Sequence, residues 1–158
     1  MRRLPALLVA VAVLAPGLVA CGDSSGPLSK TAYETKMRAV GHDFSLPPDG
    51  VATTDFKRVP AYFGTVATRL DKLVQYLGAI EPPESARDAH ARLVDGYRKE
   101  ATIVNSLAAE TRGASAARVQ LLLRQFDSTA LRSALRQIQA ADDELAARGF
   151  RISSSRGG

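Results

Sequence analysis

The chain has 158 residues, of which 46% are hydrophobic and 23% charged, with a formal net charge of +5 and a single cysteine. One cysteine excludes an intramolecular disulfide, and the length suits one domain with a single core rather than two. The basic residues form no run and are not interleaved with aromatics, so the composition gives little support to nucleic-acid binding. Aromatic residues make up only 6%, which favours close helix packing over a β-sandwich.

The first 20 residues have the pattern of a secretory signal. Arg2 and Arg3 form a positive N-terminal region, and an apolar segment of 16 residues, 4–19, follows. This segment is shorter than the roughly 20 apolar residues that a spanning helix needs, and Pro16-Gly17 interrupts it. The pattern therefore predicts a cleaved signal peptide. Its removal would leave 19 basic and 16 acidic residues, a net charge of +3.

The residues at the predicted cleavage site are Leu18, Val19, Ala20 and Cys21. They resemble the lipobox of bacterial lipoproteins, in which diacylglycerol is attached to the cysteine sulfur, the chain is cut before the cysteine, and the new amine is often acylated, for example with palmitate. The resemblance implies that the chain is cut between Ala20 and Cys21. It also implies an anchor on the outer, extracytoplasmic face of the cell membrane through acylated Cys21. The alternative is an ordinary signal peptide, cut near Ala20, that leaves Cys21 as a free thiol.

This interpretation divides the chain into four segments. Residues 1–20 are the lipoprotein signal peptide, and residues 21–27 are the lipidated cysteine with a flexible linker that has turn-forming residues and nothing apolar after Cys21. Residues 28–150 are predicted to form a helical bundle domain, and residues 151–158 a disordered tail.

Hydrophobic periodicity predicts an all-α domain, an antiparallel bundle of about four helices. The first helix is expected to begin at Ser29 or at the capping box Thr31-x-x-Glu34, and to end near Val40, before Gly41. A long connection comes next, over residues 42–54. It contains Pro47-Pro48-Asp49-Gly50, which cannot continue a helix.

The second helix has the clearest periodicity in the chain. Its apolar residues alternate at spacings of three and four in an a/d seam: Phe56, Val59, Phe63, Val66, Leu70, Leu73, Leu77 and Ile80. Such a seam forms either a coiled-coil dimer interface or the core of a bundle within one chain. Two further amphipathic helices of similar length come after it, and they favour the bundle.

Pro82-Pro83 is expected to end the second helix and to start the third, which stops before Gly113. The apolar stripe of the third helix is Ala89, Leu93, Tyr97, Val104 and Leu107. The fourth helix would begin at Ser115 and end at Gly149. Its apolar residues shift in phase near Asp127-Ser128, which indicates a bend or a break there: Val119, Leu122, Leu123, Phe126, Leu131, Leu135, Ile138 and Leu145.

Several of these residues together resemble a group of small, largely uncharacterised actinobacterial lipoproteins. The likeness rests on Leu28-Ser29-Lys30 leading to Tyr33, and on Pro82-Pro83 followed by His90. It covers most of the mature chain. Some members carry a cysteine where this chain has Gly41, so the resemblance implies no redox or disulfide role, and the group brings no established activity.

The candidate chemical residues are few. His90 and Asp88 are two positions apart, so they point to different faces of a helix, and a histidine at a bundle edge is the favoured interpretation. His42 and His90 would form a metal-ligand pair only if the connection 42–54 folded over the bundle, and no cysteine or Glu-x-x-His spacing supports this. The acidic run Asp142-Asp143-Glu144 is typical of a solvated helix face.

The chain has no nucleophile elbow and no glycine-rich phosphate loop. Four tyrosines on predicted helices either line a pocket between helices or lie at bundle rims: Tyr33, Tyr62, Tyr76 and Tyr97. The sequence therefore predicts no catalytic residue, no metal and no cofactor. It predicts a non-enzymatic, lipid-anchored protein that binds another envelope component. The alternative is a module that holds a small apolar or lipid-like ligand between the second and third helices, under Pro47-Pro48.

Overall fold

The computed structural model describes residues 26–44, 56–126 and 128–152. Over these ranges the chain is helical and contains no strand, which confirms the all-α prediction. The α-helices number five over these residues, not about four, because the predicted fourth helix is divided in two. They are α1 (Lys30–Asp43), α2 (Val59–Gly78), α3 (Arg87–Thr111), α4 (Ala116–Gln125) and α5 (Thr129–Ala147), with a 3-10 turn η1 (Glu84–Ala86) before α3.

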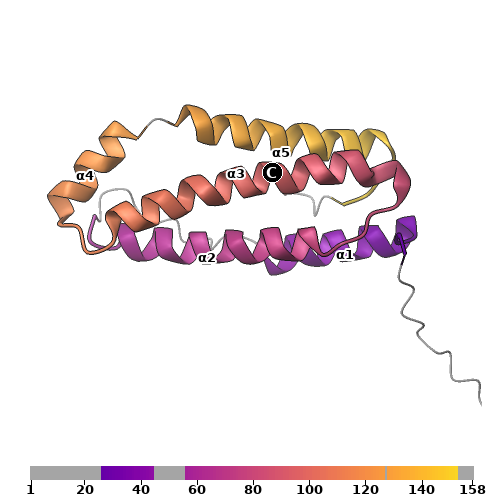
Figure 1. The fold of residues 1–158 in the computed structure, drawn as a ribbon, viewed down its shortest axis with the longest axis horizontal. Coiled ribbons are helices and arrows are strands. Elements are labelled where there is room, and N and C mark those ends of the chain that lie inside the picture. The colour runs from indigo at the N-terminus through magenta and orange to yellow at the C-terminus, as the bar shows by residue number, and fades with distance from the viewer. Residues whose placement is uncertain (1–25, 45–55, 127, 153–158) are drawn as a thin grey trace, which may run out of the picture.

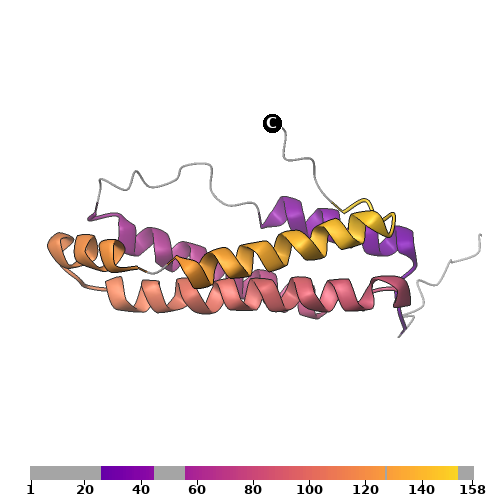
Figure 2. The same ribbon diagram turned by 90° about the horizontal axis from the view of Figure 1, so that it is seen from above.

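The helices form an elongated bundle (Figures 1 and 2), and α3 lies between α2 and α5 in the view of Figure 1. Helix α3 runs antiparallel to both α2 and α5 and packs extensively against each of them. Helix α1 packs on α2 over one half of the bundle, and the short α4 crosses the opposite end between α3 and α5. None of the described helices combines the length and the apolar character needed to cross a membrane.

Side-chain hydrogen bonds between helices show which residues lie level with one another along the bundle. The Asn105 side chain of α3 donates to Asp71 of α2 at 2.9 Å, and the Lys99 side chain of α3 donates to Gln137 of α5 at 2.8 Å. We call the described residues of 26–44, 75–97 and 137–152 the Leu28 end, and those of 56–74 and 98–136 the α4 end.

Local signals explain where several helices begin and end. The Ser29 hydroxyl accepts a hydrogen bond from the Ala32 amide at 3.3 Å, and the Ser115 hydroxyl accepts one from the Arg118 amide at 3.3 Å, so both predicted N-caps are confirmed. Gly113 and Gly149 have φ angles of 70° and 80°, the left-handed conformation that ends helices at glycine. The predicted end of the first helix was wrong, because α1 continues through Gly41 to Asp43.

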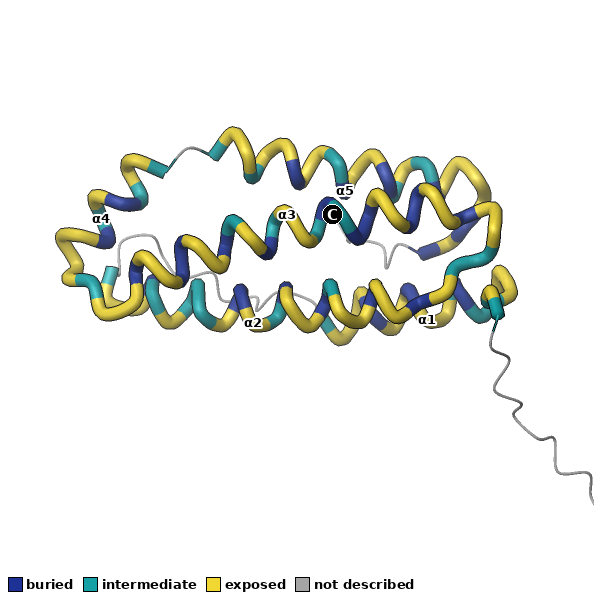
Figure 3. Tube along the Cα trace, viewed as in Figure 1, coloured by how far each residue is buried: buried dark blue, intermediate teal, exposed yellow. Residues whose placement is uncertain are grey.

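The core forms where the apolar stripes of α2, α3 and α5 meet (Figure 3). Six residues of the predicted seam are buried within the chain: Val59, Val66, Leu70, Leu73, Leu77 and Ile80. Along α5 the prediction was only partly right, because Leu135 is 45% exposed while Ala134 and Ala141 are buried. Small residues in these positions let the helices approach closely, since a Cβ on Gly96 of α3 would lie 2.7 Å from Cγ1 of Ile138.

The packed part of the chain extends past Phe150 to Ile152. Phe150 and Ile152 are 4% and 8% exposed, and the Arg151 amide donates a hydrogen bond to Oε1 of Glu34 at 3.1 Å. The disordered tail was predicted from residue 151, so its first two residues instead belong to the fold. The remainder of that tail, 153–158, lies outside the described residues.

Candidate functional site

The predicted lipidation site lies outside the described part of the chain. Leu18, Val19, Ala20 and Cys21 fall within residues 1–25, and the Pro47-Pro48 connection falls within residues 45–55. The described chain enters the bundle at Leu28, whose amide donates a hydrogen bond to the Glu81 carbonyl at 3.0 Å. Any segment that precedes residue 26 therefore joins the bundle at the Leu28 end.

His90 lies in the core at 4% exposure, and not at a bundle edge as predicted. Its Nε2 is 3.0 Å from the Leu77 carbonyl oxygen, and its Nδ1 is 3.0 Å from the Tyr33 hydroxyl. A carbonyl only accepts, so Nε2 carries the proton and the Tyr33 hydroxyl donates to Nδ1 of the neutral ring. The ring thus connects α1, α2 and α3.

The surroundings of this pair hold both groups in their neutral forms. Burial lowers the pKa of His90, and the bond to the Leu77 carbonyl offsets this in part. Burial raises the pKa of Tyr33, and the negative charge of Asp142 adds to the effect. The Tyr33 ring also meets the Phe150 ring edge-on, with 5.4 Å between centroids. The pair is a satisfied polar contact inside the core.

The structure does not bring His42 and His90 together. His42 lies at the end of α1, where its side chain is 89% exposed and contacts Asp43 at 3.2 Å. It is nine residues along α1 from Tyr33, the partner of His90, which corresponds to about 13 Å of helix. Within the described ranges there is no group of three or more His, Cys, Asp or Glu residues that could hold a metal ion.

The acidic run of α5 has three different environments. Asp142 is half-buried, and its negative charge contributes to the raised pKa of Tyr33. Asp143 is exposed and accepts a hydrogen bond from Gln139 at 2.8 Å. Glu144 pairs with Arg92 of α3 and with Arg148, and the bond from Arg92 lowers the pKa of Glu144. These residues do not form a cation site.

The four tyrosines do not line one pocket. Tyr33 is in the core, whereas Tyr62 and Tyr97 are partly buried against it. Tyr76 is 61% exposed, and its ring meets that of Phe44 at the end of α1 at a tilt of 56°, with 5.8 Å between ring centroids. Their positions, spread over three helices and both ends of the bundle, agree with tyrosines at separate helix contacts.

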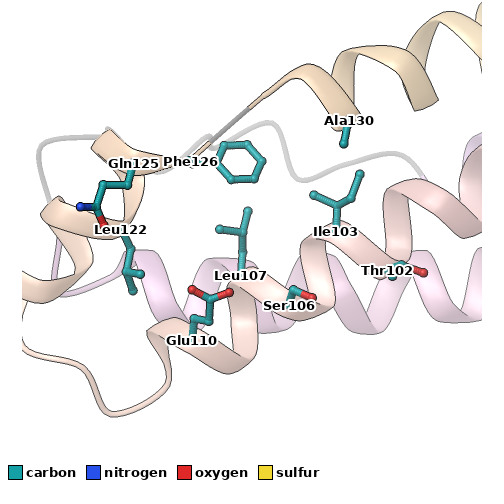
Figure 4. A pocket seen from close by; sticks show the side chains of 9 residues that line it. All are labelled: Thr102, Ile103, Ser106, Leu107, Glu110, Leu122, Gln125, Phe126 and Ala130. Atoms are coloured by element: carbon teal, nitrogen blue, oxygen red, sulfur yellow. The ribbon is translucent and has the colours of Figure 1, made fainter.

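A groove opens at the α4 end, between α3 and the junction of α4 with α5 (Figure 4). Its volume is about 420 Å³. The apolar side chains of Ile103, Leu107 and Phe126 face the opening, with Leu122 and Ala130 beside them. Polar side chains complete the lining: Thr102, Ser106, Glu110 and Gln125.

A second depression continues the groove along α3 and α5. It has a volume of about 390 Å³, shares Thr102, Ile103 and Ala130 with the first, and extends to Lys99 and Ser133. The ligand pocket expected from the sequence was placed between the second and third helices, whereas this groove lies on the α4 and α5 side of α3. The phase shift near Asp127 was the one sequence signal for it, because the helix break separates α4 from α5.

The lining of the groove is mostly apolar and carries few ionisable groups. Glu110 is the one ionisable residue among those that line the larger depression. An apolar surface with a few hydroxyl and amide groups offers contacts for a small amphiphile.

In comparisons with protein-family models, with curated proteins and with solved structures, nothing matched this chain.

Proposed function

We propose that this chain is a lipid-anchored, extracytoplasmic helical protein, non-enzymatic, that binds another component of the cell envelope. The observation that carries the proposal is the sequence Leu18-Val19-Ala20-Cys21 at the end of an apolar segment with a basic start. Six residues separate Cys21 from Leu28, where the described fold begins. This order of signal, cysteine, short linker and folded domain is what a tethered lipoprotein requires.

The chain enters the bundle at the Leu28 end, whereas the groove lies at the α4 end. Helix α3 joins the two ends and has 25 residues, about 37 Å of helix. An anchor at residue 21 would thus lie at the other end of the bundle from the groove.

The non-enzymatic part of the proposal is supported by the environment of the candidate residues. His90 is buried and fully hydrogen-bonded, so it offers no proton to a substrate in solvent. The groove brings one carboxylate, Glu110, and no histidine or lysine into its larger depression.

Intact-mass analysis of the membrane-extracted protein tests the anchor directly. We expect a chain that lacks residues 1–20 and carries the mass of a diacylglycerol group and an added acyl chain at Cys21. Cys21→Ala should remove that added mass and abolish incorporation of labelled palmitate, while the circular dichroism of the bundle stays unchanged. A wild-type mass without lipid, or a label retained by Cys21→Ala, would contradict the proposal.

The groove favours a second candidate function, the binding of a small apolar or lipid-like ligand between helices. The observation is the apolar lining made by Ile103, Leu107 and Phe126. Native mass spectrometry of the detergent-extracted protein should then detect a bound small molecule. Phe126→Ala should reduce its occupancy, and Leu135→Ala, on the exposed side of α5, should not. Equal occupancy in both variants would exclude this groove.

A further inference from the structure

Charge is distributed unevenly along the bundle. Among the described residues, the α4 end has 11 Lys and Arg against 3 Asp and Glu, a net charge of +8. The Leu28 end has 7 Lys and Arg against 9 Asp and Glu, a net charge of −2. The modest net charge of the whole chain therefore conceals a strongly basic end.

Ion pairs engage basic residues of both ends. Arg92 and Arg148 of the Leu28 end pair with Glu144, and Arg98 and Lys99 of the α4 end pair with Asp95. At the α4 end, five exposed arginines make no ion pair with any described residue: Arg112, Arg118, Arg124, Arg132 and Arg136. Their guanidinium groups remain available to an external anion.

Exposed leucines lie among these arginines. Leu121 of α4 is 42% exposed and stands three residues from both Arg118 and Arg124, so the three are neighbours on the helix surface. Leu135 of α5 is 45% exposed and lies between Arg132 and Arg136 in sequence. These leucines and arginines are all exposed, whereas Val119 and Leu122 of α4 and Ala134 and Ile138 of α5 are buried; Figure 3 shows how buried and exposed residues alternate along both helices.

The composition of this surface indicates the kind of partner. None of these arginines and leucines lines the groove. Several exposed arginines with exposed leucines among them fit an extended anionic surface better than a single small ligand. Guanidinium groups bind phosphate, and leucine side chains reach the boundary between headgroups and acyl chains.

We infer that the outer surface of α4 and α5, with Arg118, Arg124, Arg132 and Arg136 around Leu121 and Leu135, binds an anionic phospholipid membrane. This surface is distinct from the groove, and its action does not depend on lipid at Cys21. In an anchored chain, the anionic membrane would be the envelope component that the proposed function does not identify.

A single tryptophan can report the contact, because the chain contains none. Leu121→Trp places the reporter at the proposed surface, and Tyr76→Trp places one at another exposed site, on the Leu28 end. The full chain is reconstituted in vesicles of brominated phosphatidylcholine, with or without phosphatidylglycerol. Protein without lipid at Cys21 is mixed with the same vesicles from solution, so failure of the lipid anchor does not remove the readout.

We expect phosphatidylglycerol to cause a severalfold rise in bromine quenching of Leu121→Trp and to leave Tyr76→Trp unchanged. In the Leu121→Trp background, Arg118→Gln with Arg124→Gln should raise the phosphatidylglycerol content needed for half-maximal quenching roughly tenfold. The matched control, Lys36→Gln with Arg87→Gln, removes two exposed charges at the Leu28 end and should have little effect. Circular dichroism verifies that each variant is folded.

Three outcomes would overturn the inference. Quenching of Leu121→Trp that is equal in neutral and anionic vesicles would show contact without charge recognition. Equal effects of the two charge-removal pairs would show that net charge matters and this surface does not. An emission shift of Leu121→Trp with soluble polyglutamate as large as the shift with anionic vesicles would indicate an acidic polypeptide as the partner.

Discussion

The Leu28 end and the α4 end of the bundle differ in where their polar residues lie. At the Leu28 end, Tyr33, His90 and the Leu77 carbonyl satisfy one another inside the core, and Glu144 pairs with two arginines outside it. At the α4 end, the arginines of α4 and the start of α5 make no ion pair with the described residues, and a groove separates the α4–α5 junction from α3.

The location of these polar side chains determines how strongly folding depends on each of them. A polar group that is hydrogen-bonded in the core costs stability when it is changed, so it is constrained by folding. An exposed, unpaired guanidinium contributes little to folding and can be used for an external partner. The comparison therefore predicts large stability effects at the Leu28 end and small ones on the outer surface of the α4 end.

The largest effect should come from a fully buried leucine. Leu145 of α5 is 0% exposed at the Leu28 end, and Leu145→Ala should lower the free energy of unfolding by about 2–5 kcal/mol. Leu121→Ala removes the same atoms from a 42% exposed site on α4 and should cost less than about 1 kcal/mol. Urea unfolding of both variants measures the difference, and comparable losses would break the distinction between the two ends.

The same comparison shows which features a single sequence can predict. Features that depend on neighbouring residues were predicted: the caps at Ser29 and Ser115, and the seam of α2 with its spacing of three and four. These signals are local, because a cap bonds an amide three residues away and a seam repeats at the period of the helix.

Features that depend on distant residues were missed. The burial of His90 depends on Tyr33, 57 positions earlier in the chain, and no local pattern encodes that contact. The groove depends on the direction in which α4 leaves α3, which the phase shift near Asp127 indicated only as a bend or a break. Leu135 was assigned to the core because it is apolar, whereas close approach at Gly96 is achieved with Ala134 and Ile138.

The next largest effect tests the buried hydrogen bond. Tyr33→Phe keeps the ring but leaves Nδ1 of His90 without a donor, so we expect a loss of about 1–3 kcal/mol in the free energy of unfolding. Tyr76→Phe removes a hydroxyl from a 61% exposed side chain and should change stability by less than about 0.5 kcal/mol. If the two variants unfold at the same urea concentration, the bond to His90 does not stabilise the Leu28 end.

A smaller effect is expected where α3 and α5 approach closely. Gly96→Ala places a Cβ 2.7 Å from Cγ1 of Ile138 and 3.3 Å from the Ile138 amide nitrogen, so overpacking of about 1–3 kcal/mol opposes the better helix propensity of alanine. Gly64→Ala of α2 meets nothing within 4 Å and should stabilise the protein by up to about 1 kcal/mol. Thermal unfolding should move in opposite directions for the two variants, and a stabilised Gly96→Ala would contradict the close approach.

The smallest effect near neutral pH concerns the protonation of His90. Burial lowers the pKa of His90 in the folded state below its ordinary value of 6.5, so the unfolded chain binds the proton more readily. The stabilising contribution of the neutral ring is therefore complete above about pH 6.5 and is lost progressively as the pH falls below it. The slope from this one group is at most about 1.4 kcal/mol per pH unit.

Urea unfolding between pH 7 and pH 5 measures this slope, at pH values above those at which ordinary carboxyl groups titrate. His90→Gln should flatten the profile over this range, even though the variant is less stable throughout. His42→Gln serves as the control, because that side chain is 89% exposed at the end of α1. A profile that keeps its slope in His90→Gln and loses it in His42→Gln would assign the pH dependence to the surface instead of to the core of the Leu28 end.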